Sequence, residues 1–171
     1  MAGIRPNVYL TGFMGTGKSA VGKALARILR RPLVDLDSEI ERATGRRVAA
    51  IFARDGEAAF RRLERRALKR AAARGGAVVA LGGGALLDSR NRALVSRTGT
   101  LVRLTCARRE LLRRLRPERA ARPLLAGGRL EERLARLAAA RRAAYAGARR
   151  TVSTTRRSPD AAAALIARGL A

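Results

Sequence analysis

The chain has 171 residues, of which 47% are apolar and 30% charged, and its formal net charge at pH 7 is +25. This length and apolar content predict one folded domain over residues 1–171 and exclude a disordered chain. A single cysteine, Cys106, excludes an internal disulfide, and no apolar run reaches the ~18 residues of a membrane span, so we expect a cytoplasmic protein without a membrane partner.

Nearly all of the positive charge is arginine, because lysine occurs only at Lys18, Lys23 and Lys69. An arginine excess indicates either an anionic partner such as nucleic acid or arginine-covered helix faces in solvent. Aromatic residues, which could stack on bases, make up only 3% of the chain, and no nucleic-acid-binding motif occurs. We therefore expect no specific nucleic-acid partner, and we expect a monomer.

Short apolar stretches alternate with amphipathic ones along the chain, which is typical of βαβ units with a parallel sheet covered on both faces. Strands are predicted over residues 7–11, 32–35, 77–81, 100–105 and 150–154. Helices are predicted over residues 18–30, 37–43, 56–74, 88–97, 107–115, 129–146 and 159–168. Ligands of such α/β folds bind at the carboxyl ends of the strands, so functional residues should directly follow each strand.

The first strand runs into GFMGTGKS, residues 12–19, which fits the P-loop pattern G-x-x-x-x-G-K-[ST]. Glycines let the backbone N–H groups point inward around a phosphate, and the following helix adds its positive end. Lys18 can reach the β- and γ-phosphates, and the Ser19 hydroxyl can bind Mg²⁺. The nucleotide-binding residues predicted by this loop are Gly12, Gly15, Thr16, Gly17, Lys18 and Ser19.

The second strand ends in an acidic pair, Asp35 and Asp37. In an extended chain both carboxylates would point to the same side, because one residue separates them. Beside a P-loop, one carboxylate can help to hold hydrated Mg²⁺, and the other can accept a proton from an acceptor hydroxyl. The structural alternative is that Asp37 only caps the following helix while Asp35 ends the strand.

Residues 116–132, RPERAARPLLAGGRLEE, fit no regular element well. The segment is either an ordinary surface loop or a mobile lid that closes over an anionic ligand. Arginines concentrated between Pro117 and Gly128 favour the lid, which we place at about residues 116–128.

In their order and near their spacing, these motifs resemble the shikimate kinase family from Tyr9 to about Pro159. The resemblance rests on GFMGTGKS, DLDSEIE, DGEAAFRRLE, ALGGGAL and RPLLAG. It implies a nucleoside-monophosphate-kinase-like P-loop fold with a five-stranded parallel sheet, flanking helices and a mobile lid. It also implies Mg²⁺-dependent transfer of the ATP γ-phosphate to the 3-hydroxyl of shikimate, which gives shikimate 3-phosphate and ADP in aromatic amino acid synthesis.

The same resemblance assigns roles to individual residues. Asp35 would belong with Ser19 to the Mg²⁺ site, and Asp37 would contact the shikimate hydroxyls as the proposed base. Arg61 and Arg141 would bind the shikimate carboxylate, with Arg142 as an adjacent alternative to Arg141. The planar fork of an arginine suits a carboxylate because it can donate two parallel hydrogen bonds.

The remaining assignments concern backbone and nucleotide. Gly82, Gly83 and Gly84 are either a tight turn that needs positive φ or a close approach of backbone to substrate, and the resemblance implies the second. Arg122 would reach the phosphates as a catalytic residue beside Lys18 and Asp37. Arg157 would line the adenine with Pro159, and either Arg114 or Arg116 would stack on it.

Two other functions share parts of this pattern. A P-loop kinase for another small hydroxy acid, such as gluconate, would keep the loop but should lack the paired arginines for one carboxylate. A basic nucleic-acid-binding module that uses ATP as a switch would show saturable, salt-dependent binding to nucleic acid.

Overall fold

The computed structural model describes residues 5–125 and 127–170. Within them, five parallel strands form one sheet in the order β2-β3-β1-β4-β5. The strands are β1 Asn7–Gly12, β2 Leu33–Asp35, β3 Val78–Ala80, β4 Gly99–Thr105 and β5 Arg150–Ser153. The predicted parallel sheet is confirmed, and its central strand β1 delivers the P-loop to the middle of the carboxyl edge.

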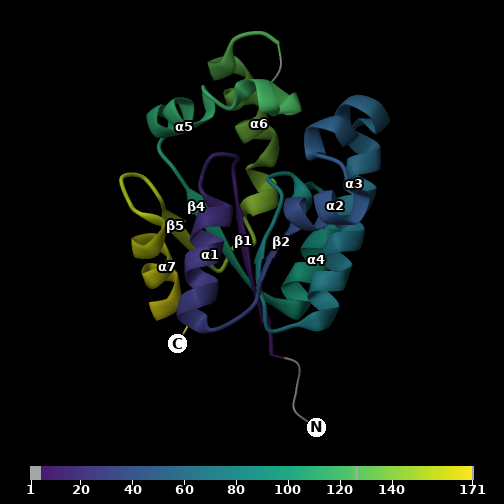
Figure 1. Cartoon of the computed structure of the whole chain (residues 1–171). Helices are drawn as coiled ribbons and strands as arrows, with labels where there is room; N and C mark the ends of the chain where they lie inside the picture. The colour runs from purple at the N-terminus through teal and green to yellow at the C-terminus, as the bar shows by residue number, and fades with distance from the viewer. Residues whose placement is uncertain (1–4, 126, 171) are drawn as a thin grey trace.

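Helices cover both faces of the sheet (Figure 1). On one face lie α1 Lys18–Leu29 and α7 Pro159–Arg168, and on the other α2 Leu36–Thr44, α3 Val48–Arg74 and α4 Ser89–Thr98. Side chains of β1 alternate between the two cores, as a strand requires: Val8 and Leu10 pack toward α1 and α7, and Tyr9 packs toward α3.

Two further helices, α5 Arg108–Leu115 and α6 Leu130–Arg141, lie above the carboxyl edge of the sheet (Figure 1). Two 3₁₀ turns, Arg119–Ala121 and Pro123–Leu125, connect α5 toward α6 through the predicted lid. A third apolar cluster joins this layer to the P-loop; its buried members are Phe13, Met14, Leu115, Leu125, Leu130 and Leu134. The layer therefore packs directly on the nucleotide-binding loop.

Several predicted boundaries were wrong. The helix predicted over residues 129–146 ends at Arg141, and a 3₁₀ turn, Ala143–Tyr145, follows it. The helix predicted over residues 56–74 is present, but a helical stretch from Val48 that precedes it was missed; the two meet at Gly56, where φ is 79° and the backbone is not helical, and together they form α3. Within the described part of the chain, no helix is both long and apolar enough to cross a membrane.

Candidate active site

The P-loop lies between β1 and α1, and its backbone follows the path that its glycines allow. Gly15 and Gly17 have φ values of 78° and 87°, in the left-handed region that a side chain disfavours. Lys18 folds back over the loop, and its ammonium donates to the carbonyls of Gly12 and Phe13, both at 3.0 Å. Burial lowers the pKa of Lys18 to about 8, although the charge of Asp37 opposes the shift.

The two aspartates lie in the same cleft, but the geometric argument that predicted this was wrong. Asp35 ends β2 and caps α2, where one of its oxygens accepts from the N–H groups of Asp37 and Ser38. Asp37 belongs to the first turn of α2 and not to an extended strand. The cap predicted for Asp37 is therefore made by Asp35, whose second oxygen accepts from the Ser19 hydroxyl at 2.5 Å.

Burial also raises the pKa of Asp37, and the neighbouring negative charge of Asp35 adds to this effect. A carboxylate with a raised pKa is a better proton acceptor than one in water. Asp37 thus has the electrostatic character that a general base at this position needs.

Arg61 of α3 lies in the cleft between two acidic side chains. One side of its guanidinium donates to Glu64 at 2.8 Å, and the other donates to Glu57 at 3.2 and 2.9 Å. Glu64 is 1% exposed, whereas the Glu57 side chain is half exposed. The buried Glu64 therefore fixes the guanidinium, and the Glu57 side holds the edge that faces solvent.

Gly82, Gly83 and Gly84 follow β3 and are needed for space. Residues 83 and 84 lie in a turn, but none of the three glycines has a positive φ, so the expectation that the turn needs positive φ was wrong. A Cβ on Gly82 would lie 2.1 Å from Glu64 Oε1, and a Cβ on Gly84 would lie 2.4 Å from the Arg61 guanidinium. A side chain at Gly82 or Gly84 would therefore displace the carboxylate of Glu64 or the guanidinium of Arg61 from its present position.

Two buried polar atoms in this cleft lack a partner among the described residues: Nη1 of Arg141 and Oε1 of Glu64. Arg141, at the end of α6, is only 2% exposed. An unpaired buried donor or acceptor costs about 1–3 kcal/mol, and more when it is charged. Leaving one nitrogen of a buried guanidinium and one oxygen of a buried carboxylate without a partner in the same cleft is physically reasonable if a ligand with both an anion and a hydrogen-bond donor pairs with them.

Arg122 reaches the same cleft from the lid segment, where its guanidinium pairs with Glu118, four residues earlier. Its positive charge is one of the influences that lower the pKa of Lys18, so it lies toward the P-loop. The cleft encloses about 450 Å³, and its lining includes Ser19, Asp35, Asp37, Arg61, Glu64, Gly82, Gly83, Gly84, Arg122 and Arg141. Residues that the sequence spreads over more than a hundred positions are therefore brought together.

A family model described as "Shikimate kinase" matches residues 14–170 of this chain. A shikimate kinase from Geobacter sulfurreducens is 46% identical over 154 residues, which are 90% of this chain and 84% of the relative. A second, from Symbiobacterium thermophilum, is 47% identical over 154 residues, 89% of this chain and 88% of the relative. The chain belongs to the shikimate kinase family.

Solved structures agree with this membership. Shikimate kinase from Acinetobacter baumannii in complex with shikimate is 35% identical and superposes with a TM-score of 0.92, covering 97% of this chain and 93% of that one. A gluconokinase from Sinorhizobium meliloti is 16% identical, with a TM-score of 0.57 over 98% of this chain and 96% of that one. The second likeness shows a shared fold alone.

Arg114 and Arg116, the two candidates predicted to stack on adenine, have different surroundings in the fold. Arg114 donates to the carbonyls of Gly15 and Thr154, both at 3.2 Å, and so joins the P-loop to the end of β5. Arg116 is exposed, and its nearest acidic group is Glu131 at 3.8 Å. Of the two, Arg114 is therefore the one that contacts the P-loop.

Arg157 is exposed and donates to the Ser153 carbonyl at 2.8 Å. It lies outside the residues that line the cleft of this family member. Its predicted contact with adenine therefore finds no support in this cleft and stays a prediction.

The sequence interpretation missed three side chains of the site. Glu57 and Glu118 pair with Arg61 and Arg122, each four residues later, and on the predicted helix that contains Glu57 and Arg61 this spacing was a usable signal. The third is Tyr145, whose hydroxyl donates to the Gly83 carbonyl at 2.6 Å. Nothing local marks Tyr145 as a site residue, because its contact spans 62 residues of chain.

Proposed function

We propose that this chain transfers the γ-phosphate of ATP to the 3-hydroxyl of shikimate, giving shikimate 3-phosphate and ADP. The observation that carries the proposal is the unpaired buried pair in the cleft, Arg141 Nη1 and Glu64 Oε1. Shikimate carries one carboxylate and several hydroxyls on a small ring. Its carboxylate would pair with Arg141 and Arg61, and a hydroxyl would donate to Glu64.

In this proposal the triphosphate lies in the P-loop, and Lys18 exchanges its two backbone carbonyls for phosphate oxygens. Arg122 leaves Glu118 and neutralises charge that develops on the transferring group. Closure of the lid over the cleft excludes water, which would otherwise compete with shikimate as the acceptor. Adenine would then lie beside Arg114 and Arg157.

Asp37 would accept the proton of the 3-hydroxyl as the oxygen attacks the γ-phosphorus in line. Its raised pKa, caused first by burial and then by Asp35, supports this role. No histidine occurs in the chain, so a carboxylate is a chemically reasonable base here. No covalent intermediate with the protein is required.

The residues present also fit a magnesium ion. The Ser19 hydroxyl and an Asp35 oxygen lie together, and Mg²⁺ commonly takes one or two protein oxygens while it keeps several waters. Within the described residues no cluster of three acidic, histidine or cysteine side chains could hold a metal ion, so protein side chains alone would not complete the coordination of Mg²⁺. Ser19 and Asp35 would hold the ion, which when bound would neutralise charge on the β- and γ-phosphates.

The cleft that holds Asp37, Arg61 and Arg141 is lined by residues from several elements of this one chain. We therefore propose a monomeric enzyme that acts on two small molecules in the cytoplasm. Neither a membrane nor a specific nucleic acid is needed for the reaction.

The test is a coupled assay of ADP release with Mg·ATP and four acceptor conditions: shikimate, quinate, gluconate and none. We expect turnover with shikimate and formation of shikimate 3-phosphate. The variant Asp37→Asn tests the assignment of the base in the same assay. Its kcat with shikimate should fall by at least ~100-fold, while it should still bind the nucleotide. Faster turnover with gluconate than with shikimate would favour the alternative kinase and contradict the proposal.

A further inference from the structure

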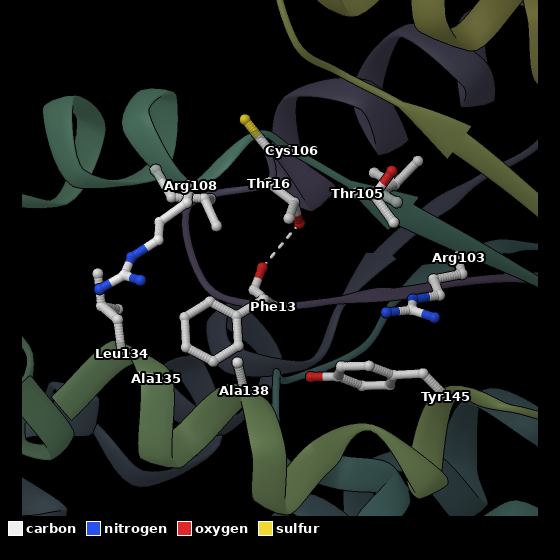
Figure 2. A pocket seen from close by; sticks show the side chains of 12 residues that line it. Phe13, Thr16, Arg103, Thr105, Cys106, Arg108, Leu134, Ala135, Ala138 and Tyr145 are labelled. Carbon is white, nitrogen blue, oxygen red and sulfur yellow. Dashed lines mark hydrogen bonds between the residues drawn. The ribbon is translucent and has the colours of Figure 1, made fainter. Parts of the chain in front are cut away.

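A second cavity lies behind the P-loop, between the end of β4, the start of α5 and the inner face of α6 (Figure 2). It encloses about 270 Å³, enough for a small molecule, and shares no lining residue with the shikimate cleft. The phosphoryl-transfer reaction proposed above places neither shikimate nor the transferred phosphate in it, although its wall includes Thr16 of the P-loop.

The walls of this cavity are mainly apolar and partly aromatic. The rings of Phe13 and Tyr145 face it, and Leu134 and Ala138 of α6 form its floor (Figure 2). Ala135 and Ala138 add small side chains to the same wall. Such a wall is typical of a pocket for a small aromatic body, which gains free energy from burial of its faces.

The polar lining of the cavity is entirely positive or neutral. Arg103 projects from β4 with its Cζ atom 5.3 Å from the centre of the Tyr145 ring, and Arg108 lies toward Leu134 (Figure 2). No acidic side chain lines the cavity. Within the described residues, neither arginine has an ion pair, unlike Arg61 and Arg122 of the shikimate cleft, each of which holds a glutamate.

Arg103 is the more informative of these two cations, because its side chain is half-buried against an aromatic ring. A partly desolvated guanidinium without a carboxylate offers its planar fork to an anion from outside. We propose that this cavity binds a small aromatic carboxylate, with its ring between Phe13 and Tyr145 and its carboxylate on Arg103.

Both aromatic walls also touch the shikimate cleft. The Arg141 guanidinium lies over the Phe13 ring, with Cζ 5.5 Å from its centre, and the Tyr145 hydroxyl donates to the Gly83 carbonyl. A molecule held between these rings would therefore contact two side chains that themselves contact Arg141 and Gly83 of the shikimate cleft.

The chain supplies its own reporter, because its one cysteine, Cys106, lines this cavity and is part-exposed. The experiment follows the rate at which a thiol reagent modifies Cys106 as phenylacetate is added, with saturating shikimate and Mg·ADP present. We expect saturable protection with a dissociation constant on the order of millimolar. Uncharged phenylacetamide, of nearly the same shape, should bind at least about tenfold more weakly.

Two arginine variants test the assigned contact. Arg103→Met keeps the apolar stem against Tyr145 and removes the charge, so phenylacetate should lose about tenfold or more in affinity while phenylacetamide is unaffected. Arg97→Met, on the exposed surface of α4, is the matched control and should bind phenylacetate like the parent. Ligand-observed NMR with the same two probes gives a second readout that does not depend on the thiol.

Three outcomes would overturn the proposal. The first is equal binding of phenylacetate and phenylacetamide by both readouts, which would mean that Arg103 selects no anion. The second is loss of phenylacetate binding when shikimate saturates the enzyme, which would place the probe in the substrate cleft. The third is an equal loss of affinity in Arg97→Met and Arg103→Met, which would reduce the effect to general charge. These outcomes leave the ADP-release assay unaffected, so the two proposals fail independently.

Discussion

At the scale of single residues, the cleft holds its two solvent-facing arginines with carboxylates of its own. Arg61 donates to Glu57, and Arg122 pairs with Glu118, each glutamate being four residues earlier in the chain. An incoming carboxylate or phosphate must displace these side chains, so part of its binding free energy is spent on the exchange. In return, each guanidinium is already ordered near the position that binding requires, so less side-chain freedom is lost when the ligand binds.

The first residue-scale prediction separates Arg61, which is proposed to bind the shikimate carboxylate, from Arg122, which is proposed to bind the phosphates. A charged hydrogen bond contributes about 1.5–3 kcal/mol, so Arg61→Ala should raise the shikimate KM by about one to two orders of magnitude with little change in the ATP KM. Arg122→Ala should instead lower kcat, because its contact strengthens as charge develops on the γ-phosphate. The measurement is a two-substrate steady-state matrix.

The control for this matrix is Arg62→Ala, one residue further along α3 but exposed on its surface. It should leave both KM values unchanged. Arg61→Lys should restore only part of the loss, since lysine lacks the planar fork. A shikimate KM for Arg61→Ala within about twofold of the parent would be far below the charged hydrogen bond expected here and would remove Arg61 from the carboxylate site.

The second residue-scale prediction concerns Lys18, whose pKa burial lowers from 10.5 to about 8. Above that pH the free enzyme loses the ammonium charge, whereas bound phosphates favour the protonated form and raise its pKa again. Affinity for Mg·ADP should therefore fall as pH rises beyond about 8, with a limiting slope of about tenfold per pH unit. Titrations between about pH 7 and 9.5 measure it.

Lys18→Arg is the control, because a guanidinium stays charged throughout this range. Its affinity for Mg·ADP should depend little on pH. The same pH dependence in Lys18→Arg and in the parent would assign the effect to another group. The same pKa shift changes the free energy of unfolding in the other direction. Below about pH 8 the buried ammonium of Lys18 lowers stability, and this loss is relieved as pH rises from about 8 toward 10.5.

At the scale of elements, the parts predicted from the sequence are those with a local signal. The P-loop follows from glycine spacing, and the alternating strands and helices follow from apolar periodicity. The acidic pair was placed in the right cleft for the wrong reason, because α2 begins directly at Leu36 and leaves no extended segment after Asp35. A strand of three residues is too short for the alternation of its side chains to show where the strand ends.

Other parts of the site had no local signal. The glycines at 82–84 serve contacts with Glu64, Arg141 and Arg61, which come from two other helices. The need for them is therefore set by tertiary packing and not by their own φ angles. The kink of α3 lies at Gly56. It could not be predicted either, since a single glycine in a helical pattern does not show whether the helix stops there or bends and continues.

The element-scale prediction compares two glycines with positive φ. At Gly12, where β1 becomes the P-loop, φ is +146° and an added Cβ would lie 2.4 Å from the Leu104 carbonyl oxygen of β4. At Gly45, the end of α2, φ is +66° and nothing lies within 4 Å. Gly12→Ala should cost more than about 2 kcal/mol of unfolding free energy, because the central strands must separate, and Gly45→Ala about 1 kcal/mol.

Urea denaturation of the two variants and the parent measures this difference. Equal losses would mean that β1 and β4 adjust freely, and the sheet would not constrain the start of the P-loop. A larger loss at Gly12 places the rigid anchor of the nucleotide site in the pairing of these two strands.

At the scale of the whole molecule, the charge balance governs both stability and association. The chain has 38 lysines and arginines against 13 acidic residues. Most cations therefore have no acidic partner within the chain. Their mutual repulsion destabilises the compact state at low ionic strength, and it creates a positive field that attracts polyanions.

The last prediction tests whether this field is only a property of the surface. If the arginines are solvated and unspecialised, added salt should weaken their repulsion and raise the thermal midpoint, as the Debye length falls from about 30 Å at 0.01 M toward 10 Å at 0.1 M. Over the same range, binding to labelled duplex and single-stranded oligonucleotides should weaken steadily, without sequence preference, because it depends on counterion release. The two measurements share one cause and should therefore move in opposite directions along one salt series. Saturable, sub-micromolar binding that persists near ~150 mM salt and changes with ATP would contradict this, since a diffuse field supplies neither stoichiometry nor a response to nucleotide.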